Sequence, residues 1–130
     1  MKAIDATIIL GLWAIDTSAT ITKGHTDLLV GGGPYGGILI HETYHSAWIE
    51  GEDPCQVRTD ITTVDQQLCG KSFLLDNGHS YAFFGCEASM RQGSFAVYDE
   101  PSGAFSHGCT YAPQTINCSN GDVVTKEWKC

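Results

Sequence analysis

The chain is poor in positive charge. Its 130 residues include seven lysines and arginines against 15 aspartates and glutamates, which gives a net charge of −8. Nucleic acids and anionic lipid surfaces bind proteins through clustered Lys and Arg, so this deficit argues against a broad contact surface for either. The sequence also lacks any run that approaches the roughly 20 apolar residues of a membrane span. We therefore expect neither a nucleic-acid nor a membrane partner.

No two of the six cysteines form a CxxC pair, the spacing typical of structural zinc sites. An even number of cysteines without that spacing predicts three disulfides in an exported protein, so we expect a secreted, extracellular chain. The predicted disulfide cysteines are Cys55, Cys69, Cys86, Cys109, Cys118 and Cys130. Their spacing does not decide how they pair. Asn117-Cys118-Ser119 fits the N-glycosylation sequon, although a chance match explains it equally well.

Internal repeats and low-complexity linkers are also missing, and 42% of the residues are hydrophobic. Residues 1–130 are therefore expected to form one globular domain. The glycine-rich segment Gly31–Gly37 lacks the Lys-Ser/Thr pair that follows a phosphate-binding loop. It is predicted to be either a flexible surface loop or a loop that contacts a partner through Tyr35.

The dipeptide Asn77-Gly78 lies between two apolar runs and predicts a two-residue type I′ hairpin turn. Counting outward from this turn pairs Phe73 with Ala82 and places Cys69 opposite Cys86, where a cross-strand disulfide can form. One predicted face carries Phe73, Leu75, Ala82 and Phe84, and the other carries Leu74, Tyr81 and Phe83. Since both faces hold large apolar side chains, we expect a central hairpin that is covered on both sides.

The remaining elements are short. Apolar and β-branched runs predict strands at Ala6–Ile15, Ala19–Thr22, Thr26–Val30, Ser94–Tyr98, Ala104–Tyr111 and Val123–Cys130. In Ile38–Glu50 the apolar residues share one arc of a helical wheel, which favours a helix, although the β-branched content also permits a strand. Thr63–Gln66 fits a capping box for a short helix that ends before Gly70. Together these elements predict a mainly β fold, a compact β-barrel or sandwich of short antiparallel strands with one or two short helices, stapled by disulfides.

The second half of the chain resembles the small secreted cysteine-rich proteins of filamentous fungi. The residues that carry the resemblance are Cys69-Gly70, Phe73, Leu75, Asn77-Gly78, Tyr81, Phe83, Gly85-Cys86, Cys109, Cys118 and Trp128-Lys129-Cys130. Members of this elicitor or effector type are perceived by a plant host and do not act by catalysis. The resemblance implies a compact disulfide-stapled β fold and a host receptor as partner. It assigns no functional residue, because the matched positions are structural.

One motif suggests different chemistry. His41-Glu42-Thr43-Tyr44-His45 is a literal H-E-x-x-H. On a helix its two histidines lie one turn apart and can bind one Zn²⁺, with Glu42 as general base and Asp53 as a third ligand. The motif therefore supports an alternative function, a zinc-dependent hydrolase of the metalloprotease type. The favoured hypothesis is a non-enzymatic protein, for which no cofactor is expected.

A small secreted ribonuclease is a further alternative. His41, Glu87, Arg91 and His107 occur in the order that a guanyl-ribonuclease-like acid–base site would use. Order alone does not bring such side chains together, and we expect surface polar residues instead. The favoured hypothesis is a secreted, non-enzymatic elicitor or effector that recognises a host protein or a second copy of itself as a homodimer.

Overall fold

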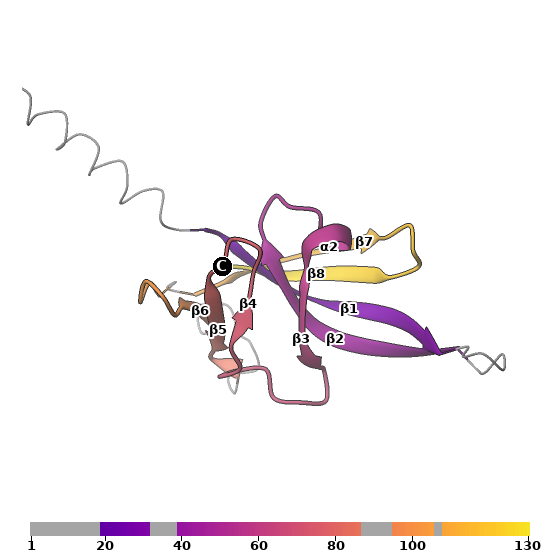
Figure 1. Ribbon diagram of the computed structural model, residues 1–130, viewed down its shortest axis with the longest axis horizontal. Coiled ribbons are helices and arrows are strands. Elements are labelled where there is room, and N and C mark those ends of the chain that lie inside the picture. The colour runs from indigo at the N-terminus through magenta and orange to yellow at the C-terminus, as the bar shows by residue number, and fades with distance from the viewer. Residues whose placement is uncertain (1–18, 32–38, 87–94, 106–107) are drawn as a thin grey trace, which may run out of the picture.

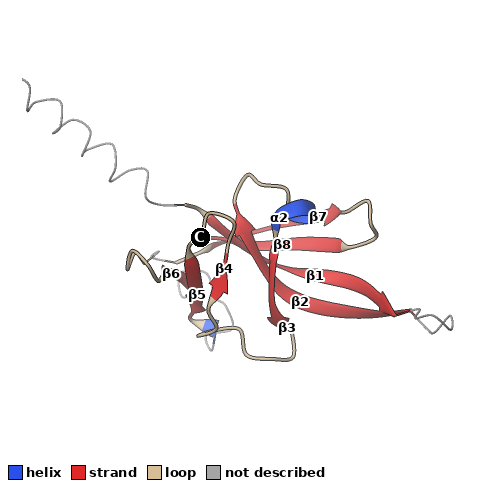
Figure 2. Cartoon of the chain, in the orientation of Figure 1, coloured by secondary structure: helices blue, strands red, loops and turns tan. Residues whose placement is uncertain are grey.

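Two antiparallel sheets and one short helix make up the described part of the chain (Figures 1 and 2). The computed structural model describes residues 19–31, 39–86, 95–105 and 108–130. The predicted strand at Ala6–Ile15 and the glycine-rich residues 32–37 lie outside these ranges. No helix within the described ranges is long and apolar enough to cross a membrane.

The larger sheet has five strands in the order β3-β2-β1-β8-β7, and the smaller has three in the order β4-β5-β6. The strands are β1 (Ile21–Gly31), β2 (Leu39–Ile49), β3 (Thr59–Thr63), β4 (Phe73–Leu74), β5 (Ser80–Phe84), β6 (Ala96–Asp99), β7 (Thr110–Asn117) and β8 (Val123–Lys129). The predicted mainly β, disulfide-stapled fold is confirmed. The sheets do not close into a barrel, so of the two expected architectures the sandwich fits.

Strands β1 and β2 form a long two-stranded ribbon where a helix and a break between strands were predicted. The helix expected at Ile38–Glu50 is wrong, because β2 pairs with β1 from Ile21↔Ile49 to Gly31↔Leu39 without interruption. The break expected at Gly24 is wrong as well. Gly24 continues the strand, and a Cβ atom there would lie 2.3 Å from the Thr125 carbonyl oxygen. Glycine is needed at this position for the close approach of β8, and no turn forms.

The predicted hairpin around Asn77-Gly78 is present, but its register differs by one residue. The strands pair Phe73 with Tyr81, and the Gly78 amide donates to the Leu75 carbonyl at 3.0 Å. Gly78 has φ +85°, so the loop has three residues, a type I turn followed by a left-handed glycine. A one-residue shift moves every side chain of one strand to the opposite face. The shift gathers Phe73, Leu75, Tyr81 and Phe83 on one buried face and leaves Leu74 and Phe84 exposed on the other, so the expectation that both faces are covered is wrong.

The short helix lies elsewhere than predicted. No helix follows the capping-box sequence Thr63–Gln66, because the Val64 amide donates to the Thr43 carbonyl at 3.0 Å and holds this segment against β2. The described helix is α2 (Pro54–Val57), which starts with proline. Its cap is Asp53, whose Oδ1 accepts from the Cys55 amide at 3.0 Å.

The last two predicted elements are partly confirmed. The predicted strand at Val123–Cys130 corresponds to β8. The hairpin predicted around residues 99–103 also forms, since the Asp99 amide donates to the Ala104 carbonyl at 2.8 Å. Its second strand is reduced to a single bridge between Tyr98 and Phe105, and β7 begins only at Thr110.

The core lies between one face of the small sheet and one end of the large sheet. Phe73, Leu75, Tyr81, Phe83, Phe95 and Val97 meet Ile21, Ala47 and Trp128 there. Aromatic rings form a continuous row across it: the ring centroids of Phe83 and Phe95 are 4.9 Å apart, and those of Phe95 and Trp128 are 5.7 Å apart. This burial orients the small sheet, with one face in the core and the other away from it.

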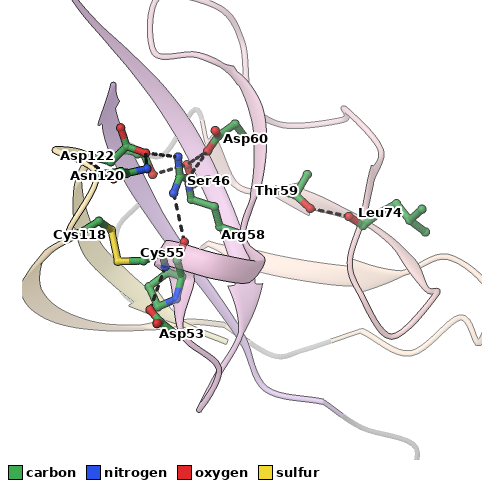
Figure 3. Close-up of polar contacts among 12 residues, drawn as sticks. Ser46, Asp53, Cys55, Arg58, Thr59, Asp60, Leu74, Cys118, Asn120 and Asp122 are labelled. Atoms are coloured by element: carbon green, nitrogen blue, oxygen red, sulfur yellow. Dashed lines mark hydrogen bonds and ion pairs between the residues drawn. A yellow bond between two sulfur atoms is a disulfide. The ribbon is translucent and has the colours of Figure 1, made fainter. Parts of the chain in front are cut away.

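The six cysteines form three disulfides, as predicted. They are Cys55–Cys118, Cys69–Cys86 and Cys109–Cys130. Beside Cys55–Cys118, the Arg58 guanidinium bonds Asp60 at 2.9 Å and Asp122 at 3.1 Å (Figure 3). The disulfide and the arginine thus attach α2 and β3 to the turn between β7 and β8. Cys69–Cys86 closes the base of the β4–β5 hairpin.

Candidate functional site: an exposed aromatic surface on the small sheet

The H-E-x-x-H motif lies on strand β2, and this changes its geometry. His41 and His45 share a face of the strand, but four residues of a strand span about 13 Å, much more than the reach of one metal ion. Glu42 lies on the opposite face, where it accepts a hydrogen bond from the Tyr44 hydroxyl at 3.3 Å. Asp53 is engaged as the cap of α2. The structure therefore does not bring the four predicted zinc-site residues together.

No group of three His, Cys, Asp or Glu side chains is placed to hold a metal ion within residues 19–31, 39–86, 95–105 and 108–130. The ribonuclease-like set cannot be assessed in the same way. Glu87, Arg91 and His107 lie outside the described residues, and only His41 of that set is placed, exposed on β2.

A cluster of charged and titratable side chains borders the core on β1, β2 and β8. Lys23 has 1% of its side chain exposed, and its Nζ lies 2.6 Å from Glu127 Oε1. Glu127 Oε2 lies 3.3 Å from Nδ1 of His25, which pairs with His45 across the two strands. Burial lowers the pKa of Lys23, although the Glu127 carboxylate opposes the shift. With its ion pair closed and its ammonium buried, Lys23 has a structural role.

His45 stays neutral within this cluster. Its Nδ1 is buried, and none of the residues that the structure describes forms a hydrogen bond with it. Burial, and then the positive charge of Lys23, lowers the pKa of His45 to about 4. A neutral imidazole suits the packing beside a buried ammonium, and protonation of His45 would oppose it.

A second polar pair, His79 and Asp99, was not predicted from the sequence, because its members lie 20 residues apart on neighbouring segments of the small sheet. His79 Nδ1 lies 2.9 Å from Asp99 Oδ2, and the imidazole stacks on Tyr81 with centroids 6.1 Å apart. A carboxylate that orients an imidazole is half of a general-base arrangement. The described hydrogen bonds of His79 reach Asp99, Asn77 and the backbone of Leu75, and none reaches a hydroxyl or thiol. The pair therefore stabilises the turn and the start of β5.

The outer face of the small sheet carries an aromatic surface, which we define as Phe84, Tyr98 and Phe105. The three ring centroids are 6.1 to 6.4 Å apart. Phe84 is 41% exposed and Phe105 is 47% exposed. Leu74, 57% exposed, lies on the same face of the sheet.

The alternation of the strands explains why these rings are outside. Tyr81 and Phe83 point into the core and are 3% and 0% exposed, so Phe84, the next residue, points the other way. Tyr98 lies opposite Ala82 on this outer face, and Phe105 lies opposite Tyr98 through the isolated bridge.

The scaffold beneath the aromatic surface is rigid. Phe84 lies two residues before Cys86, whose amide donates to the Cys69 sulfur at 3.1 Å, and the Gly70 amide donates to the Phe83 carbonyl at 3.0 Å. Exposed aromatic side chains that are gathered on a rigid scaffold are typical of protein-recognition sites. The arrangement is suited to contact with a partner protein.

Comparison of the chain with protein-family models, with curated proteins and with solved structures found no match. The function is therefore argued from the geometry of these surfaces.

Proposed function

We propose that this chain is a secreted, non-enzymatic protein of the elicitor or effector type, which acts through surface recognition of a host protein. The observation that carries this proposal is the aromatic surface formed by Phe84, Tyr98 and Phe105. Three disulfides are compatible with an oxidising, extracellular environment. The disulfide-stapled sheet holds the rings in place before binding, so little conformational entropy is lost when a partner covers them.

The energetic argument concerns the part of each ring that is still in water. Complete burial of a phenylalanine side chain contributes about 1.5–3 kcal/mol, so covering the exposed half of Phe84 or Phe105 would contribute about 1 kcal/mol each. Two such rings at the centre of an interface act as binding hot spots. A partner without a strong negative charge is favoured, because the chain itself has a net charge of −8.

The test is infiltration of the purified, tag-free protein into plant leaves, with the oxidative burst measured against protein dose. We expect a response to the native chain and at least a tenfold higher dose requirement for the double variant Phe84→Ser/Phe105→Ser. Val64→Ser is the matched control, because Val64 is equally exposed, at 47%, but lies away from the aromatic surface.

The two negative outcomes have different meanings. A native chain that elicits no response at any dose would remove the elicitor function. An equal response to the native chain and the double variant would keep the function but remove the aromatic surface from it. Light scattering of both proteins addresses the homodimer, since a self-recognising surface predicts that only the double variant is monomeric.

A further inference from the structure

The sequon Asn117-Cys118-Ser119 lies where strand β7 ends and the chain turns towards β8. It is the single match to the pattern Asn-x-Ser/Thr in the whole sequence. Asn117 is the last residue of β7, Ser119 follows in the turn, and both are exposed. N-linked oligosaccharides are bulky, hydrophilic groups of the protein surface, so the position of the sequon meets the first requirement for one.

The side-chain amide of Asn117 is free, in contrast to those of the other two asparagines. Both polar atoms of the Asn77 side chain form hydrogen bonds within the hairpin of β4 and β5. Asn120 Nδ2 donates to Asp122 Oδ2 at 3.0 Å, and its Oδ1 accepts from the Asp122 amide (Figure 3). No hydrogen bond joins the side chain of Asn117 or Ser119 to another of the residues that the structure describes. The unengaged asparagine is thus the one that belongs to the sequon.

The surroundings of Asn117 leave room for an oligosaccharide. β7 is the outermost strand of the large sheet, and its free edge pairs with none of the strands in the described ranges. Exposed strand edges tend to pair with other chains, which a bulky hydrophilic group beside the edge opposes. In Figure 1 the turn that follows β7 lies well away from the small sheet, so a group attached there leaves the aromatic surface uncovered.

The Cys55–Cys118 disulfide determines when the oligosaccharide can be attached. In the folded chain this bond and the hydrogen bond from the Cys118 amide to the Asp122 carbonyl, at 2.9 Å, hold the sequon in a tight hairpin. A transferase must enclose the acceptor segment in its own active site, and a segment tied into a hairpin does not enter one. Attachment therefore precedes closure of the disulfide, while the chain is still unfolded.

We propose that Asn117 carries an N-linked oligosaccharide in the secreted protein. The Asn117 amide nitrogen attacks the anomeric carbon of an oligosaccharide that the cell supplies on a lipid diphosphate. A C–N bond forms, the bond from that carbon to the diphosphate oxygen breaks, the lipid diphosphate leaves, and the amide gives up one proton. The Ser119 hydroxyl completes the sequon that the transferase recognises. The proposal rests on the secretion that belongs to the proposed function, and not on recognition of a host.

The test is secretion of the full chain from yeast behind a yeast signal peptide, with electrophoresis before and after treatment with a peptide-N-glycosidase. We expect this enzyme to increase the mobility of the native chain, and peptide mass spectrometry to find aspartate at residue 117 after the release. Asn117→Gln and Ser119→Ala should show no change in mobility, whereas Ser119→Thr, which keeps the sequon, should behave as the native chain does. Asn120→Ser is the matched control, because it removes an asparagine from the same turn and leaves the sequon intact. Circular dichroism shows whether each variant is folded.

A native chain without an oligosaccharide, in the medium and in the cells alike, would overturn the proposal. An oligosaccharide that persists in Asn117→Gln would overturn it too, because the attachment would then be at another residue. A third contrary result would be attachment in Cys55→Ser/Cys118→Ser but not in the native chain, since the disulfide would then close before the transfer. The leaf assay separates this proposal from the proposed function: Asn117→Gln should elicit the native response, and a native chain that elicits none would leave the mobility result unchanged.

Discussion

The ion pair between Lys23 and Glu127 is unequally buried, and the two halves should therefore differ in their effect on stability. The lysine side chain is 1% exposed and the glutamate side chain is 23% exposed. In Glu127→Gln the ammonium has no counterion and no access to water, so it must lose its proton to stay buried. From its ordinary pKa of 10.5, this loss lowers the free energy of unfolding by at most about 5 kcal/mol at pH 7.

The loss of stability in Glu127→Gln should become smaller as the pH rises. The folded variant binds fewer protons at Lys23 than the unfolded chain does, so its stability rises with pH. At pH 9 only about 1.5 pH units separate the solution from the ordinary pKa, and the upper limit falls to about 2 kcal/mol. In Lys23→Met, by contrast, Glu127 can still turn to water and to His25, and we expect a loss below about 2 kcal/mol.

Urea denaturation of the native chain and the variants at pH 7 and pH 9, followed by circular dichroism, measures these differences. Lys129→Met is the control, because Lys129 is 48% exposed and 4.0 Å from Glu50, and its loss should change the stability by less than about 0.5 kcal/mol. The reasoning is refuted if Glu127→Gln costs no more than Lys23→Met at pH 7. It is equally refuted if the cost of Glu127→Gln stays constant between the two pH values.

Three further predictions concern stability. The folded-state pKa of His45, about 4, is below its ordinary value of 6.5, so the stability it contributes is complete above pH 6.5 and is lost as the pH falls through 4. After discounting for the partial exposure of the ring, we expect a loss of about 1.5 kcal/mol, which denaturation curves should show to be absent in His45→Gln. The Cys55–Cys118 disulfide joins residues 63 positions apart and so restricts the unfolded chain. Cys55→Ser/Cys118→Ser should therefore lose about 4 kcal/mol of unfolding free energy and melt about 15 °C lower in calorimetry. An unchanged melting temperature would contradict this argument from the entropy of the unfolded chain. Gly24→Ala should lose more than about 2 kcal/mol or fail to fold, because the new methyl group meets a backbone carbonyl at 2.3 Å, and near-native stability in urea would show that β8 can move.

The disulfide framework was predictable because it depends on composition. Six cysteines without a CxxC spacing in a short chain indicate three disulfides, whatever the order of the strands. Most pairings were not predictable, because they depend on which strands become neighbours. Cys55 and Cys118 meet only because α2 lies across the turn between β7 and β8, a contact between segments that are 63 residues apart.

The conformation of residues 39–49 was not predictable from local pattern. Isoleucine, tyrosine and tryptophan occur there at positions compatible with either a helical or a strand period, so the hydrophobic spacing alone favours neither strongly. The strand is selected by pairing with β1 over its whole length. The zinc-site hypothesis depended on the helical alternative, because only a helix brings His41 and His45 within reach of one ion.

Lys23 shows a second limit of sequence reasoning. A lysine before a glycine suggests a solvated turn, so a break between two strands was expected at these residues. The side chain can be buried because it forms an ion pair with Glu127 on the neighbouring strand β8. Glu127 lies 104 residues away in the sequence. Local sequence contains no signal for such a pair, since each partner alone is typical of an exposed position.

The aromatic surface exists because the loop of the β4–β5 hairpin is one residue longer than predicted. With a two-residue turn, Phe84 would share a face with Phe73 and Leu75, and no face of the hairpin would be free. Because Asp76 joins the loop, Phe84 lies on the face opposite Phe73, and the outer face becomes available for recognition. The Cys69–Cys86 disulfide does not prevent this shift, since β4 includes only Phe73–Leu74 and the chain has left the ladder before Cys69. The disulfide is therefore compatible with either register, and the length of the turn decides whether Phe84 joins Tyr98 and Phe105 in the proposed recognition surface.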